Sequence, residues 1–63
     1  MELLQYNNKK ISLVDIDDEI WTGTAYYCDA DTNKTPEDVL VVKNERGYTE
    51  ISESEIKSIE IVK

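Results

Sequence analysis

In residues 19–28, EIWTGTAYYC, strand-forming side chains surround a single glycine. β-Branched and aromatic residues fill most of this segment, and these residue types favour β-strands. A glycine inside such a strand is typical of a sharp bend or a bulge. We therefore expect one long strand that bends at Gly23.

Shorter strands are predicted on both sides of this segment. From Lys10 onward apolar and polar residues alternate, which is the period of a strand with one buried face. Asp17 and Asp18 supply the turn into residues 19–28, and Gly47 supplies a later turn at residues 44–47. The remaining predicted strands cover residues 39–42, 48–51 and 56–62, the first of which is a continuous apolar run typical of a strand buried on both faces.

Three short helical features are predicted outside the strands. Residues 35–38 begin with a threonine and a proline followed by two acids, which is the pattern of a helix start. Ser52 and Glu55 have the spacing of a capping box, in which each side chain satisfies the other's backbone amide. The first eight residues, with Leu3, Leu4 and Tyr6, predict a short N-terminal helix.

Five short strands in 63 residues favour an all-β fold, a small, strongly bent antiparallel barrel of the Sm-like or SH3-like kind. We interpret residues 1–63 as one domain, because no linker, repeat or low-complexity tract interrupts them. The predicted core consists of Ile11, Leu13, Trp21, Ala25, Val39, Val41, Ile51, Ile56 and Ile59.

Composition limits the classes of function. The chain has 7 basic and 14 acidic residues, a formal charge of -7, which disfavours non-specific binding to nucleic acid or anionic lipid. It has no histidine and a single cysteine, Cys28, so neither an internal disulfide nor the usual zinc frameworks are available. We expect a cytoplasmic protein without a membrane segment, cofactor or metal, whose seven basic residues form no stripe.

The register of these residues resembles the Sm and Sm-like (LSm) family. That family's first motif has alternating apolar residues, an Asp at a turn, and then Gly, Asp and Asn at spacings of six, six and four. Asp17, Gly23, Asp29 and Asn33 keep these spacings after the apolar pair Ile11 and Leu13. In the second motif, Ile51, Ile56 and Ile59 keep the apolar register, and Ser52-Glu53 stands where the family has Arg-Gly.

The resemblance implies a candidate pocket for a base of single-stranded RNA at Asp29, Asp31, Asn33 and Ser52. In the family, the Asn, the Arg and a planar residue between the Asp and the Asn stack on and hydrogen-bond the base. Here Asp31 and Thr32 occupy the stacking region, and Ser52 replaces the arginine, which removes charge-assisted hydrogen bonds. The resemblance also implies homo-oligomers in which the fourth strand of one subunit pairs with the fifth strand of the next.

Two other interpretations of the acidic residues are weaker. Asp29, Asp31 and Asn33 have the spacing of the first three ligands of a calcium loop, but Lys34 stands where that loop needs glycine and Leu40 where it needs glutamate. The acidic run at residues 15–19 has the composition of a Mg²⁺ site or of paired carboxylates for acid–base chemistry, but it has no nucleophile, histidine base or phosphate loop beside it in the sequence. We therefore expect no enzymatic activity.

Two hypotheses for function remain open. The first is a non-enzymatic Sm-like binding module, oligomeric through its edge strands, whose RNA-base pocket is reduced or repurposed; its acidic charge weakens RNA binding. The second is an acidic interaction domain that binds the basic surface of a protein partner, as a mimic of nucleic acid.

Overall fold

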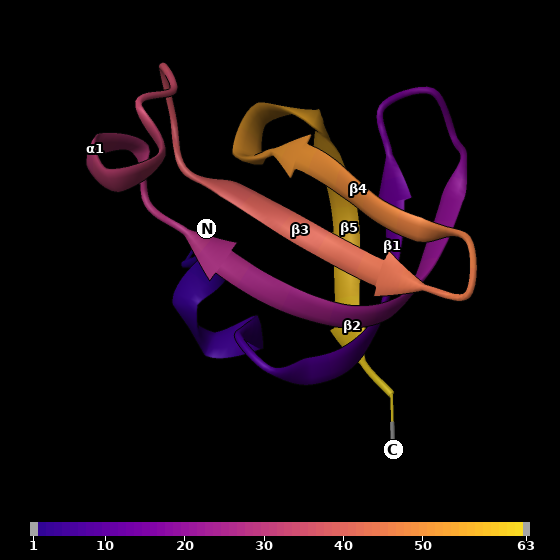
Figure 1. Ribbon diagram of the computed structural model, residues 1–63. Helices are drawn as coiled ribbons and strands as arrows, with labels where there is room; N and C mark the ends of the chain where they lie inside the picture. The colour runs from indigo at the N-terminus through magenta and orange to yellow at the C-terminus, as the bar shows by residue number, and fades with distance from the viewer. Residues whose placement is uncertain (1, 63) are drawn as a thin grey trace.

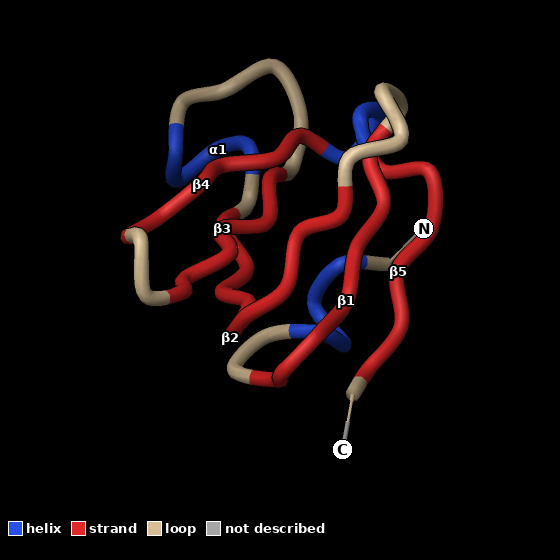
Figure 2. Tube along the Cα trace, turned by 90° about the vertical axis from the view of Figure 1, so that its right-hand side faces the viewer, coloured by secondary structure: helices blue, strands red, loops and turns tan. Residues whose placement is uncertain are grey.

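The computed structural model describes residues 2–62, which form one five-stranded antiparallel sheet in the order β4-β3-β2-β1-β5. The sheet is strongly curved, and β2 is its longest strand (Figure 1). Figure 2 shows the β3–β4 hairpin and β5 on opposite sides of the molecule. The small all-β fold predicted from the sequence is therefore confirmed. The strands are β1 (Lys9–Asp15), β2 (Ile20–Cys28), β3 (Val39–Asn44), β4 (Gly47–Ser52) and β5 (Ile56–Ile61).

Gly23 lies where β2 passes from one partner strand to the other. The first part of β2 pairs with β1, up to Ala25 opposite Lys9, and its last five residues pair with β3, from Thr24 opposite Lys43 onward. Gly23 has a φ of 149°, and a side-chain Cβ at this position would overlap the backbone carbonyl of Lys43. Glycine is therefore required here both for its backbone conformation and for the space it leaves.

The core lies on the concave side of the curved sheet. Most of the predicted core residues are buried, and Trp21 and Ile59 pack against the core while remaining partly exposed. The assignment of Val41 was wrong, because its neighbours Leu40 and Val42 point into the core instead. The buried apolar residues are Leu3, Ile11, Leu13, Ala25, Val39, Leu40, Val42, Ile51 and Ile56.

The predicted N-terminal helix is a single 3-10 turn, η1 (Leu3–Tyr6), which covers the core with the buried side chain of Leu3. The chain then joins the sheet through main-chain and side-chain bonds to β2. The Asn8 amide donates to the Ala25 carbonyl at 2.6 Å, and the Asn7 side-chain oxygen accepts from the Tyr27 amide at 2.9 Å. These bonds connect the N-terminal turn to the second half of β2.

The other two helical features differ from the sequence prediction. The helical turn in the β2–β3 connection is α1 (Ala30–Asn33), not residues 35–38, because the Asp29 carboxylate caps it. The β4–β5 connection is the 3-10 turn η2 (Glu53–Glu55), but Ser52 makes no side-chain capping bond there. The expected capping box is therefore absent.

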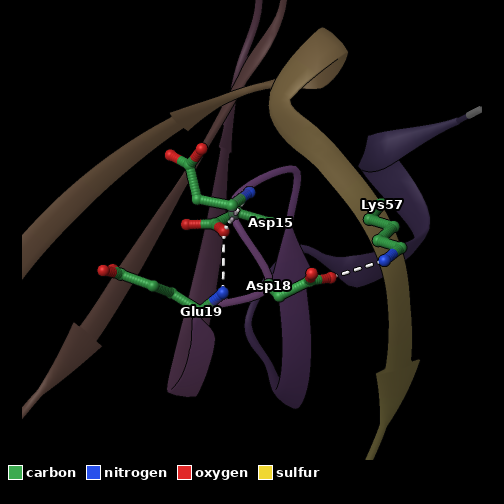
Figure 3. A network of polar contacts seen from close by, with 5 residues as sticks. Asp15, Asp18, Glu19 and Lys57 are labelled. Atoms are coloured by element: carbon green, nitrogen blue, oxygen red, sulfur yellow. Dashed lines mark hydrogen bonds and ion pairs between the residues drawn. The ribbon is translucent and has the colours of Figure 1, made fainter.

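The acidic run between β1 and β2 is an ordered turn (Figure 3). One carboxylate oxygen of Asp15 accepts from the Asp17 and Glu19 amides, and the other accepts from the Trp21 indole N–H at 2.8 Å. The Trp21 hydrogen bond is the main reason why the pKa of Asp15 is lowered. Asp18 extends to Lys57 on β5, with 2.5 Å between Oδ1 and Nζ, so the turn is also attached to the neighbouring strand.

The close contact at Gly23 leads to a stability prediction. We expect Gly23→Ala to destabilise the protein by about 3 kcal/mol or more, because the new Cβ meets a backbone carbonyl that cannot rotate away. Gly47→Ala is the matched control, because Gly47 also has a positive φ, 119°, but open space around the added Cβ. Its cost should be about 1–2 kcal/mol. Urea unfolding measures both, and equal losses would contradict the steric explanation.

Candidate functional site

The two loops that carry the predicted pocket residues lie side by side. Val39 at the start of β3 pairs with Ser52 at the end of β4, which brings the β2–β3 connection next to the β4–β5 connection. The Glu53 amide donates to the Asp38 carbonyl at 3.0 Å and continues this contact beyond the strands. Figure 1 shows both connections on the side of α1, away from the β3–β4 turn.

Asp29 has a structural role within its own loop. Its carboxylate accepts from the Thr32 amide at 2.6 Å, and its carbonyl accepts from the Asn33 amide at 3.0 Å. The hydrogen bonds from Thr32 lower the pKa of the Asp29 carboxyl. The carboxylate that the resemblance assigns to a base pocket is therefore already engaged as the cap of α1.

The Asp38 carboxylate joins the two ends of the β2–β3 connection. One of its oxygens accepts from the Ala30 amide at 2.8 Å, and the other accepts from the Tyr27 hydroxyl at 3.1 Å. Burial, followed by the neighbouring Asp38 carboxylate, raises the pKa of the Tyr27 phenol. This hydroxyl therefore remains a hydrogen-bond donor at neutral pH.

Glu37 connects this loop to the β4–β5 turn through its side chain. The Ser54 amide and hydroxyl both donate to the Glu37 carboxylate, at 2.5 and 3.1 Å. Sequence analysis missed Glu37, Asp38 and Ser54, because the fold brings together residues 17 positions apart that no motif spacing relates. Only the presence of oxygen-bearing side chains in both loops could have indicated the contact.

The other predicted pocket residues are placed nearby without forming a base-binding constellation. Asp31 is exposed on the first turn of α1, Asn33 is half-buried at its end, and Ser52 is half-buried at the end of β4. No hydrogen bond is described between the side chains of Asn33 and Ser52 within residues 2–62, and the residues between Asp29 and Asn33 offer no planar ring for stacking.

This region carries a strong excess of negative charge. We call residues 29–38 together with residues 52–55 the acidic end. Against one cation, Lys34, it contains Asp29, Asp31, Glu37, Asp38, Glu53 and Glu55. In residues 2–62 no three metal-ligating side chains gather closely enough to hold a metal ion. The acidic end therefore has a strongly negative electrostatic character.

A second region, at the other end of β2 and β3, was not predicted from the sequence. We call it the hairpin groove; it is an open cavity of about 840 Å³ between the start of β2 and the β3–β4 turn. Lys10 and Arg46, which are far apart in the sequence, both line it. Its walls are formed by Lys10, residues 20–23 and residues 44–49.

Comparison of the chain with protein-family models, with curated proteins and with solved structures finds no match. In the described residues, no helix has the length and apolar character needed to cross a bilayer.

The contact between Glu37 and Ser54 predicts that replacing Glu37 lowers the protection of the Ser54 amide from hydrogen exchange. We expect Glu37→Ala to accelerate hydrogen exchange of the Ser54 amide and to lower the free energy of unfolding by about 1 kcal/mol, because two hydrogen bonds to a charged group at the protein surface are lost. Glu60→Ala is the control, an exposed glutamate on β5 that should change stability by less than about 0.5 kcal/mol. Unchanged exchange at Ser54 in Glu37→Ala would contradict the contact.

Proposed function

We propose that the chain is a non-enzymatic Sm-like binding module that assembles with copies of itself through its edge strands. The observation that carries the proposal is the strand order β4-β3-β2-β1-β5. In the part of the chain that the structure describes, β4 and β5 each pair with one neighbour, so each has one free edge. These are the two strands that the resemblance to Sm proteins pairs between subunits.

The composition of the β5 edge supports this assembly. Ile61 is 48% exposed and Val62 is 45% exposed, although both are apolar. A free edge that also exposes apolar side chains is favourable for pairing with another chain, because pairing satisfies backbone groups and removes apolar surface from water. Of the two charged residues on β5 that oppose such pairing, Lys57 is engaged with Asp18, and Glu60 is exposed.

The proposed module has a reduced RNA-base pocket. Asn33 keeps the position that the resemblance assigns to base recognition, but Asp29 is engaged in capping and Ser52 supplies no positive charge. Negative charge at the acidic end opposes the approach of phosphates. We therefore propose that RNA binding by this pocket is weak and depends strongly on salt.

A second candidate function is favoured by the acidic end itself. Six carboxylates and one cation lie in two loops that are joined by hydrogen bonds, so the charge is presented on a defined surface. Such a surface is complementary to a basic protein partner. Charge reversal at the exposed residue Asp31 should then weaken capture of that partner, whereas reversal at Glu60 on β5 should not.

Edge pairing predicts a mass in solution that depends on β5. We expect light scattering of the purified chain to give a multiple of the single-chain mass, and the double variant Ile61→Lys/Val62→Lys to give the single-chain mass, because two added charges oppose strand pairing. Leu4→Lys is the control; Leu4 is an exposed apolar residue on η1, outside the edge strands, and its variant should keep the wild-type mass. A single-chain mass for the wild type at all concentrations would refute assembly.

The reduced pocket predicts weak, salt-sensitive RNA binding. Fluorescence anisotropy with a uridine-rich oligonucleotide should detect binding at low salt, with affinity falling as salt rises. Asn33→Ala should weaken it, whereas Asn44→Ala, which changes an asparagine at the end of β3, should not. No binding at low salt, or equal binding by Asn33→Ala, would rule out a surviving pocket.

A further inference from the structure

The hairpin groove has the dimensions of a ligand-binding site. Its volume of about 840 Å³ falls within the range of about 300–1,000 Å³ that is usual for binding pockets. One wall is the start of β2, and the other is the β3–β4 turn with the first residues of β4. The close crossing at Gly23, which is itself a lining residue, fixes these two walls relative to each other.

The walls of the groove carry large apolar side chains that are open to solvent. Ile20 and Tyr48 are each 69% exposed, and Trp21, which also lines the groove, is half-buried and packs against the core. The Trp21 indole N–H already donates to Asp15, so this side chain offers the groove the apolar surface of its ring. Exposed apolar side chains that converge on a concavity mark an interaction site.

Positive charge gathers at the same place in this acidic chain. Lys10 and Arg46 line the groove, and an adjoining cavity of about 230 Å³ shares Lys10 and adds Lys43. The Lys43 ammonium also lies 5.6 Å from the centre of the Tyr48 ring. Among residues 2–62, Glu45 is the one acidic residue that lines either cavity, so the groove attracts an occupant with negative charge.

The geometry points to a short, extended acidic peptide segment with one large apolar side chain as the occupant of the hairpin groove. The apolar side chain would contact Ile20, Trp21 and Tyr48, and the carboxylates beside it would pair with Lys10 and Arg46. This inference goes beyond the proposed function, because it uses neither the acidic end nor the free edge of β5.

The distribution of charge favours a peptide over single-stranded nucleic acid. A nucleic acid strand brings one negative charge with every nucleotide, and proteins that bind such strands offer a continuous positive groove along the backbone. Here two cations, Lys10 and Arg46, line the groove, cations such as Lys34 and Lys57 lie elsewhere, and the chain as a whole carries -7. A peptide segment with one or two carboxylates is attracted by the cations of the groove. It brings fewer negative charges to this acidic chain than a nucleic acid strand does.

The test is a selection from random peptides. The full chain is incubated with an array of random-sequence peptides of about eight residues, and bound peptides are remeasured in solution by fluorescence anisotropy. We expect the selected peptides to share acidic residues beside an aromatic or large aliphatic residue. Uridine and adenine oligonucleotides serve as nucleic acid probes in the same assay.

Variants in the hairpin groove and at the acidic end show which of the two surfaces binds the selected peptides. Arg46→Glu and Tyr48→Ala should each weaken the selected peptides at least about tenfold, because one reverses the charge of the groove and the other removes its exposed ring. Lys34→Glu makes the same charge change at the acidic end and should leave peptide affinity unchanged. Both groove residues are exposed, and a thermal melt checks that each variant folds. Selection of no peptide or of basic peptides, full binding by Arg46→Glu, or a preference for the oligonucleotides would overturn the inference.

Discussion

The close approach of β3 to Gly23 determines the rest of the fold, because it allows β2 to pair with both β1 and β3. The first part of β2 completes a ladder with β1, and its last part begins a ladder with β3. A side chain at Gly23 would separate β3 from β2 at the start of the second ladder. The curvature that follows from this crossing encloses the core and sets the β2–β3 and β3–β4 connections at opposite ends of the molecule (Figure 1).

This arrangement also separates charge. Carboxylates collect where β2 and β4 end, and several of them are used locally: Asp29 caps α1, Asp38 joins the ends of its loop, and Glu37 reaches Ser54. Lys10, Lys43 and Arg46 lie at the hairpin groove and its adjoining cavity, although the acidic run at residues 15–19 directly precedes β2. The net charge of -7 is therefore unevenly distributed over the surface.

Sequence reasoning predicted the features that depend on local pattern. The alternation after Lys10, the apolar run at residues 39–42 and the glycine inside residues 19–28 were sufficient for five strands and a bend. It was wrong where two local signals competed. The proline at position 36 suggested a helix start, but the Asp29 carboxylate accepts from the Thr32 amide, and α1 lies nearer the N-terminal end of the loop.

The hairpin groove and the contact between Glu37 and Ser54 could not be predicted from the sequence. Lys10 and Arg46 become neighbours of the same cavity only because β2 curves, and Glu37 reaches Ser54 only because β4 returns beside β3. Neither relation has a spacing that recurs in the sequence. The candidate residues that could be named beforehand, such as Asn33 and Ser52, came from a resemblance and not from the pattern of the chain itself.

Nuclear Overhauser spectroscopy of the isotopically labelled chain reports which strands lie against each side of Gly23. If β3 crosses β2 at this glycine, the Gly23 α-protons give cross-peaks to Ile11 on β1 and also to Lys43 and Asn44 at the end of β3. Cross-peaks to Ile11 without any to residues 43 and 44 would mean that β3 does not cross β2 at the glycine.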